Sequence, residues 1–366
     1  MTSVEASPPP SLVQRISPPN WRQLIAAVGV AALAAGYVVV RGMKDPAVSD
    51  FDQLWHAARA LMRGLDPYEY VGPNGVFVWD YLFYPLPAVL IVSPLAMLPL
   101  LASRACFAAL SAGLLTWVFL RHHPARLFLL LSAPFLVAVG RGQFSPLLVA
   151  TAFIPMLTWL GLAKPNIAVP IWLGSRNPRL GFIAGVVGGL ILIAISFLVF
   201  PGWFSSWLEM LSRKNRSTSL PILGKGGFVI LLALLRWRRP EAKLLFGLGI
   251  LPQTPGLYDT VPLFLVPRGF RESCVLAISG NVALLLLVIA PGLTTAEIGA
   301  RYAERVMLWS SLFMYLPCAL MILRRPNDKS TAEPGRFTGN RADVALLCAL
   351  AVTAFFAGWA TLGRYL

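Results

Sequence analysis

Charged side chains are scarce in this sequence. Only 13% of its 366 residues are Asp, Glu, Lys or Arg, while 57% are hydrophobic. A typical soluble domain is about one-quarter charged, so this shortage excludes an ordinary soluble protein. Several apolar runs approach the roughly 20 residues that an α-helix needs to cross a bilayer. The composition therefore predicts an all-α polytopic membrane protein.

Histidine and cysteine are also few, with three and four copies. No two histidines have the i, i+4 spacing of a helical zinc site, and the cysteines all lie inside apolar runs. No glycine-rich phosphate loop follows a strand-like run, so no nucleotide-binding domain is expected. We therefore predict neither a metal, a cofactor nor a disulfide framework. The residues in question are His56, His122, His123, Cys106, Cys274, Cys318 and Cys348.

Acidic residues number 16 against 31 Lys and Arg, which leaves a net charge of +15. Such an excess is compatible with a nucleic-acid partner. Cytoplasmic loops of membrane proteins are, however, rich in Lys and Arg for topological reasons. We therefore expect the basic residues to contact membrane lipids and not a nucleic acid.

The few acids are unevenly placed, because six of the 16 lie in or just before the polar stretch 49–87. Apolar residues recur there at helical spacing over 51–62, which predicts an amphipathic helix lying in the membrane interface. Ser49, with Asp52 three residues later, has the form of a capping box, and Gly64 is expected to end the helix. Ionisable residues at the edge of a membrane domain indicate a functional site. The six acids are Asp45, Asp50, Asp52, Asp66, Glu69 and Asp80.

The run SDFDQLWHAARALMRGLDPYEY, followed by FYPLPAVLIVSPLAMLP, resembles the start of the membrane glycosyltransferases of family 87. These are the mannosyltransferase-like group of the GT-C superfamily. The shared pattern is an Asp-Phe pair, an Ala-Arg pair, Gly-x-x-Pro-Tyr, a Tyr-Pro run and Pro-Leu-Ala-x-Leu-Pro. The chain departs from the family's Tyr-Pro-Pro at Leu86. Gly-Gln at 142–143 and Lys-Pro at 164–165 also recur in the family at these places.

The resemblance implies a GT-C-like fold with a catalytic aspartate in the first extracytoplasmic loop, which falls on Asp50. It also implies transfer of a mannose-like hexose from a polyprenyl-phosphate sugar to a lipid or glycan acceptor. The reaction would take place on the extracytoplasmic face of the plasma (inner) membrane. Asp50 would be the general base, with Asp52 in reserve. Without the resemblance, charge complementarity with the helix dipole is the better explanation of Asp50 at a helix N-terminus.

The order of apolar and polar runs predicts one transmembrane domain over 21–366, after a disordered cytoplasmic tail at 1–20. We expect about ten to twelve transmembrane helices, the first two at 21–40 and 82–100, and extracytoplasmic loops at 41–81 and 201–226. By this count the basic run RHHPAR at 121–126 lies outside, against the positive-inside rule. Either the count is off at this point or these bases face a ligand phosphate, and we favour the first explanation.

We expect cations in otherwise apolar surroundings to bind the phosphate that leaves the sugar donor, because guanidinium and ammonium groups bind phosphate oxygens. For Lys164 the alternative is snorkelling to the interface, and for the basic second loop it is contact with anionic headgroups. The predicted donor-binding residues are Arg216, Lys214, Gln143 and Lys164.

Two apolar pieces, 244–251 and 261–266, are each too short to cross a membrane, and basic residues flank them on both sides. We therefore predict a hairpin that enters and leaves at one face, with Tyr258 and Asp259 near its tip. Together with His56 and Tyr84, these two residues are assigned to the acceptor side of the cavity.

A lipid or solute transporter, or a flippase, is the competing functional class. Such proteins also have helices broken by proline and charges within the membrane. Many of them contain an internal repeat, and none is visible between the two halves of this sequence.

Overall fold

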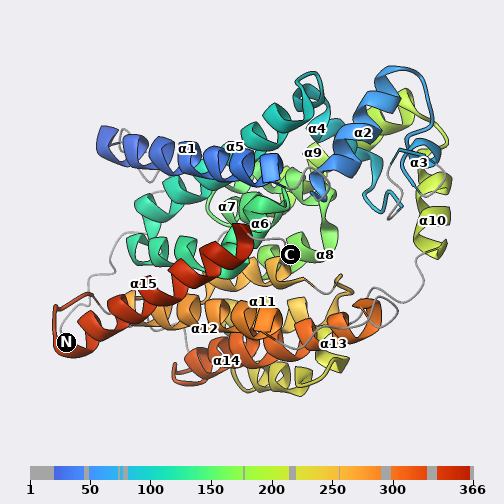
Figure 1. The fold of residues 1–366 in the computed structure, drawn as a ribbon. Helices are drawn as coiled ribbons and strands as arrows, with labels where there is room; N and C mark the ends of the chain where they lie inside the picture. Colours follow the sequence, from blue (N-terminus) through green and yellow to red (C-terminus); the bar gives the residue numbers. More distant parts are fainter. Residues whose placement is uncertain are drawn as a thin grey trace, which may run out of the picture.

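The computed structural model describes residues 20–44, 49–72, 75–76, 81–175, 178–213, 220–254, 256–289, 298–327 and 336–362. Every element in these ranges is a helix (Figure 1). The predicted tail, apart from residue 20, lies outside the described residues. So do Lys214, Arg216, Asp45 and Asp80.

Six helical segments in the described ranges are long and apolar enough to cross a membrane. The last but one runs through a π-helical turn, η6 (Ser311–Tyr315), which joins α13 to α14. The prediction of an all-α, multi-pass membrane protein is thereby confirmed. The six are α1 (Trp21–Lys44), α5 (Leu100–His122), α9 (Pro178–Val199), α12 (Phe270–Ile289), the segment Tyr302–Leu323 of α13 (Ile298–Ser310) and α14 (Leu316–Leu323), and α15 (Arg341–Leu362).

The expected ten to twelve spans are not all single helices of spanning length. Most of the remaining apolar sequence forms α- or 3-10 helices of 7 to 11 residues, many of which begin at a proline. Within the described residues, one pair of these short helices, α6 and α7, is together long and apolar enough to cross a membrane, and the pair is bent by 111°. The short elements are α4 (Leu86–Ala96), η1 (Pro124–Leu131), α6 (Ala133–Gly140), α7 (Ser145–Thr151), η2 (Pro155–Ala163), α8 (Pro165–Leu173), η4 (Gly227–Arg236), α11 (Pro240–Ile250) and η5 (Leu257–Leu265).

The predicted second span at 82–100 is wrong. Its helix, α4, has 11 residues, which corresponds to about 16 Å against roughly 30 Å of hydrocarbon. Both of its flanks stay beside α2 (Phe51–Met62) and α3 (Pro67–Tyr70). The Trp55 indole N–H donates to the carbonyl of Leu98 at 3.1 Å, and the Tyr68 hydroxyl donates to the carbonyl of Tyr84 at 3.2 Å. The chain therefore re-enters the membrane domain from the end at which it left.

Helix α5 runs antiparallel to α1 as a result. Gln23 near the start of α1 donates to the carbonyl of Leu120 at 3.3 Å, while Gly42 near its end faces Leu101. The basic run 121–126 thus lies at the same end of the molecule as the N-terminus of α1. The conflict with the positive-inside rule came from counting α4 as a span.

Hydrogen bonds and an ion pair hold further arginines at that same end. Arg126 in η1 donates to the carbonyls of Leu265 and Pro267, at 2.7 and 2.9 Å, and so ties η1 to the end of η5. Nearby, Glu241 at the start of α11 accepts from Arg268, just after η5, at 2.7 Å. The two ends of the predicted hairpin therefore meet, and the described residues of its tip are 251–254 and 256.

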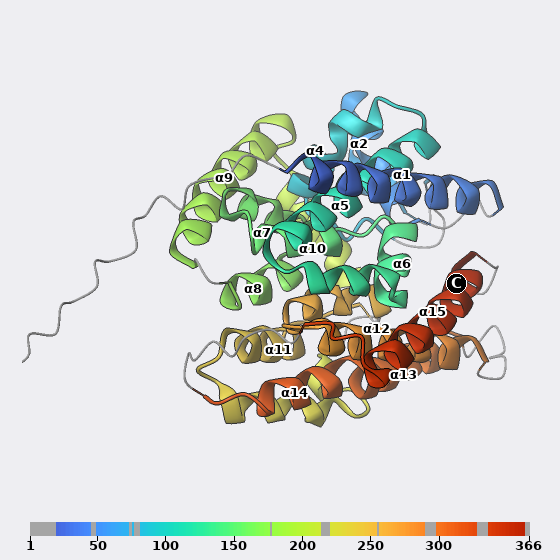
Figure 2. The same ribbon diagram turned by 90° about the vertical axis from the view of Figure 1, so that its left-hand side faces the viewer.

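Helices α2, α3 and α10 (Trp203–Arg213) gather at the opposite end, on the right in Figure 1. The Trp207 indole N–H donates to the carbonyl of Phe83 at 2.9 Å. In the view turned by 90°, α11 to α14 form a layer beneath the α1 to α8 half (Figure 2). Helix α10, from the second predicted outer loop, thus lies beside the chain that follows the first loop, and it also contacts α3 within that loop.

Candidate active site

A sharp turn between α6 and α7 forms one wall of the candidate site. Gly142 takes φ +63°, a left-handed conformation that favours glycine, and Pro146 lies in the first turn of α7. A β-carbon on Gly142 would lie 2.5 Å from the Phe51 β-carbon. Only glycine therefore allows this turn and the start of α2 to pack so closely.

Helix α2 is fastened to this turn by its own first residues. The Phe51 N–H and the Ser49 hydroxyl both donate to the carbonyl of Arg141, at 3.3 and 3.0 Å. The Ser49 hydroxyl is thus a donor to another element and not the N-terminal acceptor expected of a capping box. The residue held between these two contacts is Asp50.

Asp50 makes no side-chain cap on α2, and its backbone is already helical. Its carboxylate accepts instead from the Gln143 side-chain amide, which comes from the α6–α7 turn. The Arg141 guanidinium lies 3.7 Å from its other oxygen. Helix capping therefore does not account for Asp50, and its side chain remains 26% exposed.

Lys164 extends this hydrogen-bond chain to the hairpin tip. Its ammonium group donates to the Gln143 carbonyl oxygen at 3.0 Å and to the Asp259 carboxylate at 2.5 Å. It also lies 5.1 Å from the ring centroid of Tyr258. Lys164 directly precedes α8 and is only 13% exposed, so it points into the protein and does not snorkel to the interface.

These groups stand on the wall of a cavity of about 530 Å³. It opens between α2, the α6–α7 turn, the start of α8, the hairpin tip and α10. Three breaks between short helices, at the α6–α7 turn, before α8 and at the hairpin tip, therefore meet at one polar cavity. Irregular backbone within a membrane domain is tolerated where it is buried in protein or lines such a cavity. The lining residues are Asp50, Gln53, Phe83, Tyr84, Pro85, Gln143, Ala163, Lys164, Pro165, Asn166, Trp207, Leu211, Pro252, Thr254 and Tyr258.

Tyr84 adds a neutral donor to this cavity. Burial, together with the nearby Asp50 and Asp259 carboxylates, raises the pKa of Tyr84 well above its ordinary value. A phenol is protonated at neutral pH even at its ordinary pKa, and the upward shift keeps it protonated at higher pH, so Tyr84 offers an O–H donor at the cavity wall.

Two predicted site residues lie elsewhere. Asp52 is paired with Arg104 of α5 through two hydrogen bonds, one of them 2.7 Å from the guanidinium Nε. Burial raises the pKa of Asp52, while Arg104 opposes that shift. Asp52 thus fastens α2 to α5 and does not line the cavity. His56 lines a separate groove on the outer side of α2.

Sequence reasoning gave no site role to two residues that the structure brings in. They are Arg141, which lies beside the Asp50 carboxylate, and Trp207, which lines the cavity. The signal for Arg141 was its place beside Gln143 at a helix break. In the described ranges, no group of three or more His, Cys, Asp and Glu side chains is placed to hold a metal ion.

The arrangement presents a partly exposed carboxylate, oriented by an amide, across from a buried ammonium group and two phenols. It suits a polar substrate that must lose a proton to the carboxylate while its polar oxygens are held by donors. No protein-family model, curated protein or solved structure compared with the chain matches it.

Proposed function

We propose that this chain is a membrane glycosyltransferase with a GT-C-like fold. It moves a mannose-like hexose from a polyprenyl-phosphate sugar to a hydroxyl of a lipid or glycan on the extracytoplasmic face of the plasma membrane. The observation that carries the proposal is Asp50, which faces the 530 Å³ cavity and is held there by Gln143 instead of capping α2. The resemblance of residues 49–100 to family 87 adds to it.

In this mechanism the acceptor hydroxyl attacks the anomeric carbon of the sugar and gives its proton to Asp50. The bond between that carbon and the phosphate oxygen breaks, the phosphate leaves on its lipid, and the anomeric configuration inverts. Gln143 holds one carboxylate oxygen, so that the carboxylate keeps one orientation toward the cavity. A base must lie within about 2.6–3.2 Å of the proton's oxygen, which an acceptor in this cavity can satisfy.

The leaving phosphate needs positive charge near it. Asp50, Arg141, Lys164 and Asp259 carry two negative and two positive charges, so they balance one another. A phosphate that binds beside Lys164 would compete with Asp259 for its ammonium group. The further cations expected from the second loop, Lys214 and Arg216, follow α10 directly and remain a prediction.

Sugar transfer in membranes tests the proposal. With a radiolabelled polyprenyl-phosphate sugar as donor, Asp50→Asn should lower the rate by about 10²–10⁴-fold, because the amide cannot accept the proton. Asp66→Asn is the matched control. Asp66 caps α3 by accepting from the Tyr68 N–H at 2.8 Å, a role that Asn fills equally well. Undiminished transfer by Asp50→Asn would contradict the assignment.

One observation favours a second candidate, a lipid transporter or flippase. The breaks at Gly142, at Lys164 and at the hairpin tip bring three discontinuous helices to one polar cavity, a design that transporters also use. Movement of a fluorescent polyprenyl or phospholipid analogue across proteoliposomes that contain the purified chain, without transfer of sugar, would support this alternative.

A further inference from the structure

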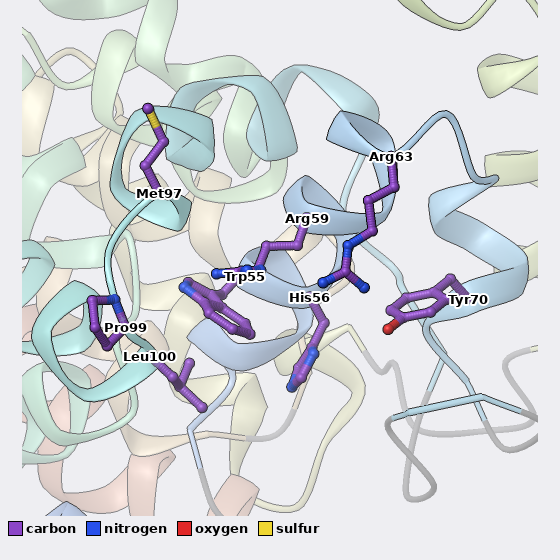
Figure 3. A pocket seen from close by; sticks show the side chains of 8 residues that line it. All are labelled: Trp55, His56, Arg59, Arg63, Tyr70, Met97, Pro99 and Leu100. Atoms are coloured by element: carbon purple, nitrogen blue, oxygen red, sulfur yellow. The ribbon is translucent and has the colours of Figure 1, made fainter.

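A second hollow lies on the outer side of α2, and we call it the α2 groove. It has a volume of about 600 Å³ and shares no lining residue with the cavity that Asp50 faces. Figure 3 shows the side chains that line it. At about 100° per residue, its α2 residues lie on the face of the helix turned away from Asp50 and Gln53. The groove is lined by Trp55, His56, Arg59, Arg63, Tyr70, Met97, Pro99 and Leu100.

The polar part of the α2 groove is cationic. Arg59 and Arg63 are one helical turn apart, and no acidic residue lines the groove. In the described part of the chain, neither arginine forms an ion pair with a carboxylate. Arg59 stacks over the Trp55 ring at 4.8 Å. In Figure 3 the Arg63 guanidinium points into the space between His56 and Tyr70.

The remainder of the α2 groove is apolar. Met97 is 77% exposed, and Leu100 is the first residue of the spanning helix α5. The Trp55 indole, whose N–H is bound to the Leu98 carbonyl, lies beside them. Because a spanning helix begins here, the groove lies at the depth where hydrocarbon gives way to headgroups, a level that tryptophan favours.

We propose that the α2 groove binds the phosphate of an anionic membrane phospholipid. The phosphate sits between Arg59 and Arg63, whose planar guanidinium groups suit its oxygens. The lipid's acyl chains run over Met97 and Leu100 into the bilayer. A lipid fits this groove better than a soluble anion does, because half of the lining residues are apolar and they lie at the start of the spanning helix α5. The inference does not depend on the proposed sugar transfer.

Native mass spectrometry of the purified, delipidated full chain tests this site. The probes are phosphatidylglycerol, phosphatidylcholine and inorganic phosphate. We expect one tightly held phosphatidylglycerol in the wild type, and binding weakened by about tenfold or more in Arg59→Gln/Arg63→Gln, because the charge-assisted contacts are lost. Arg59→Lys/Arg63→Lys should recover part of the binding, since lysine supplies the charge without the planar fork.

The matched control is Arg22→Gln/Arg121→Gln, which removes the same charge. These arginines also stack over tryptophans, Trp21 and Trp117, at the other end of the α1–α5 pair. The control should keep the tight lipid. The proposal would be overturned if both double variants lost phosphatidylglycerol to the same extent. It would also be overturned if the wild type held phosphatidylcholine as tightly as phosphatidylglycerol, or if inorganic phosphate displaced the bound lipid. If the groove variant does not fold, the exposed single substitution Arg63→Gln carries the same test.

Discussion

At the scale of single residues, Asp50 and Asp52 show how two neighbouring acids acquire different roles. A step of two residues turns a helical side chain by about 200°, so the two carboxylates point to opposite sides of α2. Asp50 meets the Gln143 amide at the cavity, and Asp52 meets the Arg104 guanidinium in the protein interior. The sequence identified both as candidates, but only their partners distinguish them.

Loss of Arg104 should destabilise the fold. The side chains of Arg104 and Asp52 are 7% and 6% exposed, so Arg104→Leu leaves a buried carboxylate without its counter-ion. We expect a loss of about 3–5 kcal/mol in the free energy of unfolding, measured by denaturant titration in detergent. Arg213→Gln breaks the exposed pair with Glu209 and should leave stability unchanged. Comparable stability of the two variants would contradict a structural role for the buried pair.

Glu241 should make stability depend on pH. Burial acts to raise its pKa, but hydrogen bonds and the nearby Arg268 and Arg325 hold it below the ordinary value of 4.5. Its stabilising contribution is therefore complete above about pH 4.5 and is lost as the pH falls through the lower, folded-state value. Thermal unfolding in detergent should show this acid dependence in the wild type. Glu241→Gln should be less stable than the wild type at pH 7, and its stability should fall less as the pH is lowered. A pH profile of stability identical to that of the wild type would contradict a role for Glu241.

At the scale of elements, the α6–α7 turn determines whether α2 presents Asp50 to the cavity. Local pattern predicts three parts of this arrangement: the apolar runs on either side of the turn, the break at Arg141 and the amphipathic helix over 51–62. It does not predict the 111° bend and the contact of Ser49 and Phe51 with the Arg141 carbonyl. They depend on residues about 90 positions apart, whose pairing no local pattern contains.

Gly142→Ala tests this arrangement. The left-handed backbone costs a residue with a side chain about 1–2 kcal/mol, and the new methyl group would overlap Phe51. We expect lower thermal stability in detergent and loss of sugar transfer, since α2 must move away. Gly29→Ala in α1 is the control, because no atom lies within 4 Å of the added carbon. Transfer retained by Gly142→Ala would show that the close packing is not required.

At the scale of the whole molecule, the two ends differ in architecture and in charge balance, because acids such as Asp50, Asp52 and Asp66 accompany the cations at the α2 end. Arg22, Arg121, Arg126, Arg268 and Arg325 share one end, while α2, α3 and α10 form the other. Loops rich in arginine favour the cytoplasmic side. The cavity and the α2 groove should then both lie toward the extracytoplasmic side.

Cysteine labelling tests this orientation. In a background with Cys106 and Cys348 replaced by alanine, a membrane-impermeant maleimide should label Glu69→Cys and Ser205→Cys in intact cells. Arg238→Cys, which is exposed at the basic end, should react only after the membrane is opened. Labelling of position 238 in intact cells would reverse the orientation. Labelling of 69 and 205 on different sides would contradict the contact of α3 with α10.

The sequence by itself determined the membrane class, the helical content, the amphipathic helix, the hairpin and the residues worth considering, because composition and helical periodicity are local properties. Only the tertiary structure decided which of them meet. Asp50, Tyr84, Gln143, Lys164, Tyr258 and Asp259 come together, while Asp52 and His56 do not. It also decided that α4 is too short to cross the membrane. A hydropathy count missed this because the run stays apolar on average although its prolines limit the length of the helix. Which side chains meet depends on where the breaks between helices fall in space, and that follows from packing between distant segments.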